Sequence, residues 1–218
     1  ERIRDLFGRH GGHAAAAAAA AAGEVRMGGE RREVAVLFVD VVGSTGLGAA
    51  REPEEVVEVL NRFFGVVVGT VEEHGGWINK FEGDAALAVF GAPAPVADPA
   101  GAALAAARRL AARLAERVPE VGLGIGVSAG EVIAGNVGDV RRYEYTVIGD
   151  PVNEAARLTE IAKTVPGGVV AAAAAVEMAA DGEARRWDLG EPVVLRGRGS
   201  ATRLATPAVA ARASRPAG

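Results

Sequence analysis

The chain has 218 residues, of which 50% are hydrophobic and 24% charged, a length and composition that suit one domain with a substantial core. Its formal net charge of −4 argues against a nucleic-acid-binding protein, because such proteins need a cationic surface. The sequence has no cysteine and no uncharged apolar run of the roughly 20 residues that a membrane-spanning helix needs, so thiol chemistry is excluded and we expect a soluble domain.

The first thirty residues differ in composition from the rest of the chain. Ala14 to Ala22 is an uninterrupted alanine run, which favours a helix but offers little surface for packing. We therefore interpret residues 1–30 as a connector, with a boundary near Gly28-Gly29-Glu30-Arg31-Arg32. The chain begins at Glu1 without a methionine or a signal peptide, and we interpret it as a segment of a longer protein.

A strand and a long helix are predicted next. Residues 34–39 form a β-branched apolar run, typical of a strand buried on both faces, so we expect a strand over 33–42. Pro53, flanked by glutamates, suits the first turn of a helix, and Gly75-Gly76 suits its end. Apolar residues recur between them at helical spacing, at Val56, Leu60, Phe63, Val67 and Val71.

Alternating strands and helices continue along the chain. We expect a hairpin over 77–90 and then a helix that begins at Asp98-Pro99 and stops before Pro119. Glycine-punctuated strands over 121–137 and a strand over 143–148 follow. A third helix should run from Asp150-Pro151 to about Lys163, with Asp150 as its N-cap, and strands are expected over 193–195 and 203–206. This order predicts an α+β fold with a ferredoxin-like split βαβ (βαββαβ) core, extra C-terminal strands, and an antiparallel sheet with helices packed on one face. The domain would span residues 31–207, followed by a disordered tail over 208–218.

Asp40 is the most informative residue of the sequence. It stands inside the most apolar strand, where a carboxylate is costly to bury unless it is paired or bound to a metal. Gly43-Ser44-Thr45-Gly46 follows at once, and a glycine-bearing turn after a strand exposes N–H groups that can bind phosphate oxygens. A strand-end aspartate that caps the next turn is the simpler alternative for Asp40 taken alone.

A second aspartate, Asp84, lies beside Gly83 at the turn of the predicted hairpin. If the hairpin pairs with the Asp40 strand, the two carboxylates converge at one edge of the sheet. Paired carboxylates near a phosphate-binding turn suit Mg²⁺ or Mn²⁺, and two such ions can hold the attacking and leaving oxygens of a phosphoryl transfer. Taken alone, Gly83-Asp84 is ordinary turn chemistry.

Asn153 and Arg157 are the third pair of candidates. They lie four residues apart in a predicted helix and therefore share one of its faces. An amide and a guanidinium there can hold a developing phosphate charge. A solvated helix face is the commoner meaning of such a pair in isolation.

Four segments together point to a family. FVDVVGST (38–45), KFEGDAALAVF (80–90), GEVIAGNVG (130–138) and YTVIGDPVNEAAR (145–157) follow one another in an order and spacing that resemble the class III nucleotidyl cyclase catalytic domain. The resemblance extends from about Arg31 to Thr206, and the arginine- and alanine-rich style is similar to that of actinobacterial, in particular mycobacterial, members. Residues 2–10 resemble the connector that often precedes this domain, frequently after a membrane-attached relay.

The resemblance implies an adenylate cyclase, which converts ATP to 3′,5′-cyclic AMP and pyrophosphate by in-line attack of the ribose 3′-oxygen on the α-phosphate. Asp40 and Asp84 would bind two divalent cations, Mg²⁺ or Mn²⁺, with the Val41 carbonyl as a further ligand. Asn153 would orient the ribose, and Arg157 would stabilise charge at the α-phosphate. The other triphosphate contacts would come from Val42, Gly43, Ser44, Thr45, Arg141 and Arg196.

By the same resemblance, Lys80 and Thr146 read the base. Lys80 would donate to adenine N1, and the Thr146 hydroxyl would accept from the N6 amino group. The best-known pattern has aspartate at the Thr146 position; a hydroxyl can also donate, so guanine O6 is less firmly rejected. We favour ATP because guanylate-forming relatives usually carry glutamate at the Lys80 position. Among 24 basic residues only Lys80 and Lys163 are lysines, which is consistent with a need for a compact donor at Lys80.

The family builds each site from two chains, one supplying the metal-binding carboxylates and the other the asparagine and arginine. The resemblance therefore implies a head-to-tail homodimer with two shared sites, in the cytoplasm, under an upstream regulatory or membrane-attached sensor domain that this chain lacks. No nucleic-acid partner is expected. The alternatives are a guanylate cyclase, a catalytically weak nucleotide-binding regulatory module, a diguanylate cyclase or polymerase-palm relative, and a plain partner-binding domain.

Overall fold

The structure is a computed structural model that describes residues 27–43, 51–139 and 141–208. Its strands form one sheet in the order β2-β3-β1-β4-β6-β8-β7, with β5 paired to β4. The strands are β1 (Gly28–Val42), β2 (Trp77–Glu82), β3 (Ala85–Phe90), β4 (Gly122–Asp139), β5 (Arg142–Ile148), β6 (Val169–Ala172), β7 (Trp187–Val194) and β8 (Ala201–Pro207). The helices are α4 (Pro53–Glu73), α5 (Pro99–Arg117), α6 (Asp150–Ala162), α7 (Ala173–Met178) and α8 (Asp181–Ala184).

The predicted α+β class is confirmed. The chain runs β1-α4-β2-β3-α5-β4, the expected βαββαβ order, and further strands follow. Within the described ranges, β4 and β6 are the only pair of named strands that run parallel, so the sheet is largely antiparallel. The predicted alanine helix at Ala14–Ala22 lies outside the described residues, as does the tail beyond Ala208.

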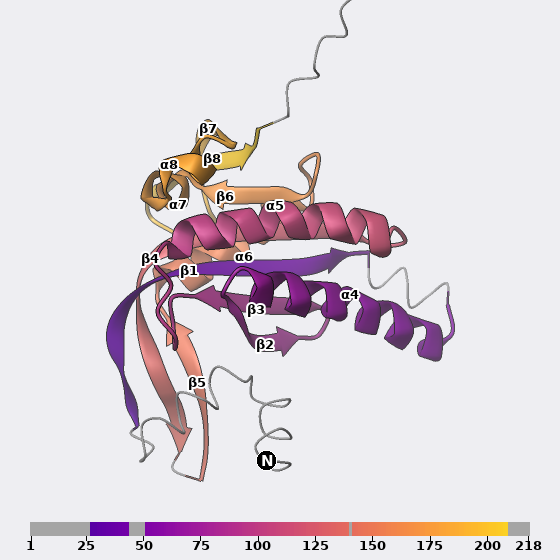
Figure 1. Ribbon diagram of the computed structural model, residues 1–218, viewed down its shortest axis with the longest axis horizontal. Helices are drawn as coiled ribbons and strands as arrows, with labels where there is room; N and C mark the ends of the chain where they lie inside the picture. The colour runs from indigo at the N-terminus through magenta and orange to yellow at the C-terminus, as the bar shows by residue number, and fades with distance from the viewer. Residues whose placement is uncertain (1–26, 44–50, 140, 209–218) are drawn as a thin grey trace, which may run out of the picture.

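One face of the sheet is covered by α4 and α5 (Figure 1). On that face the odd-numbered residues 35–41 of β1 belong to a buried cluster with Phe63 and Val67 of α4 and Leu104 and Leu110 of α5. Full burial of a side chain of this size stabilises the fold by about 1.5–3 kcal/mol. The two long helices are therefore anchored by an apolar stripe each, as their sequence periodicity predicts.

Helices α4 and α5 share one face of the sheet as expected, whereas the opposite face carries α6. Val34 and Val36, which point away from α4 and α5, pack in a second cluster that includes Ala155 of α6. The helix lies so close to β4 that a Cβ added at Gly126 would meet the Ala155 carbonyl oxygen at 2.2 Å and the Thr159 nitrogen at 2.5 Å. Glycine is therefore required at Gly126 by the approach of the helix backbone.

Gly126 makes room for α6 and does not interrupt its strand, which explains one difference from the sequence prediction. Residues 121–137 were expected as several strands separated by glycines, whereas β4 is one 18-residue strand. Its far half pairs with β5, and the two form an arm that extends beyond the helices (Figure 1). A second difference is at α6, where the N-cap is Gly149, which has no side chain to cap the helix, and Asp150 is the first helical residue.

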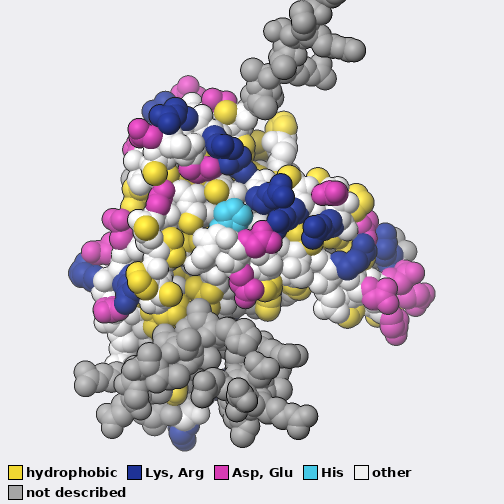
Figure 2. Space-filling view, viewed as in Figure 1, with side chains coloured by type: hydrophobic (Ala, Val, Ile, Leu, Met, Phe, Trp, Pro, Cys, Tyr) yellow, Lys and Arg dark blue, Asp and Glu magenta, His cyan; other side chains and the backbone are white. Residues whose placement is uncertain are grey.

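The face over α4 and α5 is cationic in part. Figure 2 shows basic side chains gathered around a histidine on this face. A pocket of about 370 Å³ is lined by His74, Arg108, Arg109 and Arg186, with two alanines. Arg108 is already held by two hydrogen bonds to Glu183, at 2.7 and 2.8 Å. This patch lies on the opposite side of the sheet from α6.

Candidate active site

The pairing of β1 with β3 brings the backbones of Asp40 and Asp84 to the same end of the sheet. Asp40 lies opposite Ala85, and Asp84 directly precedes Ala85 in the turn between β2 and β3. Directly opposite residues of an antiparallel pair have Cα atoms about 4.5–5.5 Å apart. The register therefore brings the two residues to one end of the sheet, and the convergence of their carboxylates stays a prediction.

An ammonium group neutralises Asp40. Lys163 follows the last residue of α6, and its Nζ lies 2.6 Å from Asp40 Oδ2 and 2.9 Å from Glu160 Oε1. Partial burial disfavours the charged lysine, but hydrogen bonds to the two carboxylates outweigh this effect and raise the pKa of Lys163. Lys163 is thus charged at neutral pH, and a cation fits against Asp40.

The donor atoms at this end of the sheet suit Mg²⁺ or Mn²⁺. Asp40 and Asp84 offer carboxylate oxygens and Val41 a backbone carbonyl, which are the hard ligands that these ions prefer. No group of three His, Cys, Asp or Glu side chains that could hold a metal occurs within the described ranges. Remaining ligands would therefore be water or substrate phosphates, which is the usual arrangement for Mg²⁺.

The chain turns out of β1 beside these carboxylates. Val42 is exposed, and Gly43 has a φ of 79°, in the left-handed region that favours glycine. An open pocket of about 570 Å³ adjoins the turn, with Val42, Gly122 and Lys163 among its lining residues. Ser44 and Thr45, which we expected to hold phosphates, lie outside the described residues.

Helix α6 presents Asn153 and Arg157 to solvent. Its buried residues, among them Ala155, Leu158 and Ala162, lie on the face toward the sheet. Asn153 and Arg157 are both exposed on the other face, one turn apart. The structure therefore leaves an amide and a guanidinium available to a ligand outside the helix.

A buried carboxylate fixes the beginning of α6. Glu154 is 8% exposed and accepts hydrogen bonds from the hydroxyls of Ser128, at 2.5 Å, and Thr202, at 2.6 Å. Arg198 also bonds to Glu154, and its second terminal nitrogen lies 2.5 Å from Asp150 Oδ2. This network ties α6 to β4, to β8 and to the loop between β7 and β8.

Asn153 and Asp40 do not meet within one chain. At a rise of about 1.5 Å per residue, Asn153 lies about 15 Å along the α6 axis from Lys163, the residue that contacts Asp40. Asn153 and the Lys163–Asp40 contact therefore lie at different ends of the helix, and Arg157 lies between them, about 9 Å from Lys163 along the axis.

Asn79 bonds to one of the two base-reading candidates and directly precedes the other in the chain. Thr146 of β5 is 7% exposed, and its hydroxyl donates to Asn79 Oδ1 at 3.1 Å. Lys80 follows Asn79 in β2, and its Nζ is 3.3 Å from Glu82 Oε1. Lys80 and Phe38 both lie opposite Leu87, so the Lys80 side chain is on the same sheet face as Asp40.

Arg141 and Arg196 lie on two different loops. Arg141, at the end of the β4–β5 arm, pairs with Asp139 at 2.7 Å, and its hydrogen bonds lower the pKa of that carboxyl. Arg196 is exposed in the β7–β8 loop, which Arg198 ties to the first turn of α6. The structure thus leaves Arg196 near the Asn153 end of α6 and Arg141 far out on the arm.

Sequence reasoning missed the supporting residues Lys163, Asn79, Glu154 and Arg198. A signal existed for Lys163, since it is one of two lysines in a chain that otherwise uses arginine. The other three had no such signal, because each acts through a contact between segments far apart in the sequence.

Comparisons with known proteins agree with this geometry. Over residues 28–203 the chain matches the family described as the adenylate and guanylate cyclase catalytic domain. It is 54% identical over 207 residues to the uncharacterized protein Rv1318c of Mycobacterium tuberculosis, a match that covers 95% of this chain and 38% of that protein. The chain thus spans less than two-fifths of the length of that curated relative.

Solved structures give a similar result. The guanylyl cyclase Cya2 is 32% identical, with a TM-score of 0.71, and the match covers 82% of this chain and 93% of that one. The adenylyl cyclase CyaB from P. aeruginosa has the same fold, with a TM-score of 0.74 at 21% identity over 84% of this chain and 97% of that one. None of the helices in the described ranges combines the length and apolar character that a bilayer crossing requires.

Proposed function

Because the chain belongs to the adenylate and guanylate cyclase catalytic domain family, and is therefore a nucleotidyl cyclase domain, we propose that it makes cyclic AMP and pyrophosphate from ATP. The observation that carries the choice of ATP is the hydrogen bond of Thr146 to Asn79, the residue that directly precedes Lys80 in β2. It gives the base site a cationic donor for adenine N1 and a hydroxyl acceptor for the N6 amino group.

The chain's own residues position the substrate and stabilise charge. Asn153 orients the ribose, and Arg157 donates to the α-phosphate oxygens as charge develops there. Gly43, Ser44, Thr45, Arg141 and Arg196 hold the remaining phosphates, with Val42 lining the turn. Divalent cations held by Asp40, Asp84 and the Val41 carbonyl would supply Lewis-acid activation of the 3′-hydroxyl and neutralise phosphate charge.

The complete site is shared by two chains in a head-to-tail homodimer. The separation of about 15 Å along α6 between Asn153 and the Lys163–Asp40 contact supports this arrangement, because a second chain can bring an Asn153 closer to Asp40 than its own chain does. The β4–β5 arm also exposes apolar side chains that a second chain can cover, at Ile133, Val137, Tyr143 and Ile148. A C2 dimer would contain two equivalent sites.

The proposed setting is the cytoplasm, as part of a longer protein. The length of the Mycobacterium tuberculosis relative supports the presence of further domains, which are candidates for the sensor that regulates the cyclase.

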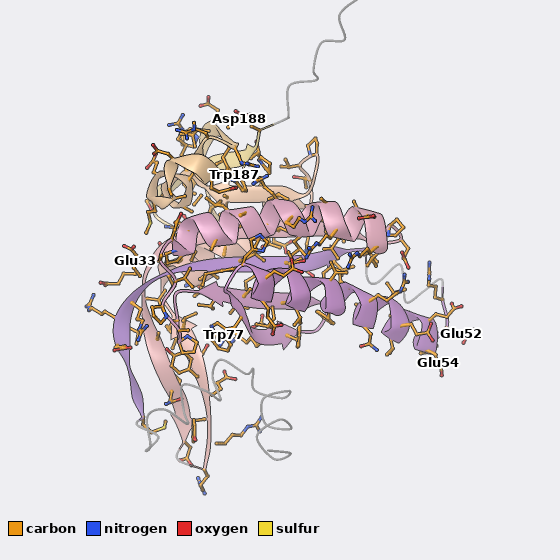
Figure 3. All side chains as sticks on the ribbon, viewed as in Figure 1. Glu33, Glu52, Glu54, Trp77, Trp187 and Asp188 are labelled. Atoms are coloured by element: carbon orange, nitrogen blue, oxygen red, sulfur yellow. The ribbon has the colours of Figure 1, made fainter. Side chains whose placement is uncertain are left out.

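The proposal is tested by identifying the product made by purified protein from ATP and from GTP, with Mg²⁺ or Mn²⁺, by chromatography and mass spectrometry. We expect cyclic AMP to form faster than cyclic GMP, and Asp40→Ala to reduce the rate by at least about a thousandfold. Asp188→Ala is the matched control, since Asp188 is an exposed aspartate of β7 (Figure 3) and should leave the rate unchanged. Faster cyclic GMP formation, or undiminished activity of Asp40→Ala, would contradict the proposal.

A further inference from the structure

Asn79 occupies an irregularity in β2. The register with β3 shifts between Ile78, which lies opposite Ala88, and Lys80, which lies opposite Leu87. Asn79 is therefore the extra residue of a β-bulge, and bulges re-aim the side chain that they contain. Here the amide side chain reaches β5, which pairs with β4 and not with β2.

The orientation of the Asn79 amide is fixed by its two contacts. Its Nδ2 donates to the Tyr145 carbonyl oxygen at 2.9 Å, and a carbonyl oxygen can only accept. Oδ1 must then be the atom that faces Thr146, whose hydroxyl oxygen lies 3.1 Å away. Since Oδ1 has no hydrogen, the hydroxyl hydrogen of Thr146 lies between the two oxygens.

This contact removes an ambiguity in the chemistry of threonine. A hydroxyl has one hydrogen and two lone pairs, so a free threonine can either donate to a ligand or accept from it. In this protein the single hydrogen of Thr146 is committed to Asn79. Only lone pairs remain for a ligand, and Thr146 is held as an acceptor, as an aspartate would be.

We propose that Asn79 is a specificity-determining residue that makes Thr146 select adenine over guanine. The inference rests on the proposed function, since it assumes that Thr146 faces the base. The adenine N6 amino group donates to the lone pairs of Thr146. The guanine O6 atom carries lone pairs of its own at the equivalent position, so guanine would leave both oxygens without a hydrogen between them.

The test measures the ratio of kcat/KM for ATP to kcat/KM for GTP in one set of variants. Asn79→Ala frees the Thr146 hydroxyl to rotate and donate, and we expect the ratio to fall about tenfold, the value of one hydrogen bond. Asn79→Asp keeps an acceptor for the Thr146 hydroxyl but loses the donor to the Tyr145 carbonyl, so its ratio should fall less than that of Asn79→Ala. A general loss of folded protein lowers both rates and leaves the ratio unmoved.

A double-mutant cycle isolates the effect on Thr146. In a Thr146→Val background there is no hydroxyl to orient, so adding Asn79→Ala should leave the ratio as it is in Thr146→Val alone. Asn61→Ala is the control, because Asn61 is an exposed asparagine of α4, and its ratio should not change.

The outcomes for the two proposals are separate. Preference of the natural protein for GTP, or absence of cyclic product, counts against the proposed adenylate cyclase. An unchanged ratio in Asn79→Ala, or an equal fall in the Thr146→Val background, overturns the role of Asn79. If no product forms, the same variants are compared by competition of ATP and GTP for a fluorescent nucleotide analogue. A fall in the ratio of ATP affinity to GTP affinity in Asn79→Ala then supports the role of Asn79, and an unchanged ratio overturns it.

Discussion

Lys163 Nζ lies 2.6 Å from Asp40 Oδ2, so an internal cation occupies the carboxylate that we propose as a metal ligand. The lysine is held at the end of α6, and a metal ion arriving at Asp40 must displace it or lie beside it. Two cations in contact with one carboxylate repel each other, by several kcal/mol at about 4 Å in a protein-like medium. The ion pair therefore opposes metal binding in the free enzyme.

Lys163→Met should bind Mn²⁺ more tightly in the absence of nucleotide. We expect the dissociation constant, measured by isothermal titration calorimetry, to fall about threefold to tenfold because the competing charge is gone. The variant should also lose about 1 kcal/mol of unfolding free energy, since an ion pair is removed. Lys163→Arg keeps the charge and serves as the control. Weaker Mn²⁺ binding by Lys163→Met would mean that the lysine assists the metal site.

Glu154→Gln should disturb α6 without touching its exposed face. The substitution replaces an acceptor oxygen by an NH₂ group, so at least one of Ser128, Thr202 and Arg198 loses its partner. We expect a loss of about 2–4 kcal/mol in urea unfolding. A fall in kcat of at least about tenfold should accompany it, because Asn153 and Arg157 are displaced. Glu177→Gln, on an exposed position of α7, is the control; equal stability of the two variants would contradict the network.

Gly126→Ala should push α6 away from the sheet. The added Cβ would lie 2.2 Å from the Ala155 carbonyl oxygen, and we expect a loss of about 1–3 kcal/mol by calorimetry. Gly69→Ala is the matched substitution, since a Cβ at this α4 position meets no atom within 4 Å. It should stabilise the protein by about 0.5–1 kcal/mol through helix propensity. A gain of stability in both variants would contradict the tight approach of α6 at Gly126.

Much of the fold could be predicted because its signals are local. Pro53 and Pro99 begin the two long helices where expected, and Asp98 caps the second by accepting from the Gly101 nitrogen at 2.8 Å. The apolar run of β1 is buried on both faces, as its composition predicts. The short elements β6 and α7 were not predicted, since alanine-rich segments lack a hydrophobic period that distinguishes strand from helix.

The site could be predicted only in part, for a physical reason. The local sequence alone marks Asp40, Asp84 and the Asn153–Arg157 pair as candidate functional residues. Asn79 and Glu154 look like ordinary polar residues of a strand and a helix. Their importance comes from partners on other elements, Thr146 and Arg198, and a pairing of that kind is visible only in three dimensions.

The sharing of each site by two chains is tested most directly by mixing two inactive variants. Asp40→Ala and Asn153→Ala chains are dissociated, combined in equal amounts and reassociated, with heterodimers verified by two affinity tags. Each heterodimer would hold one intact site, so the mixture should recover about a quarter of the natural cyclic AMP rate, while either variant alone stays inactive. No recovery in verified heterodimers would contradict the shared site.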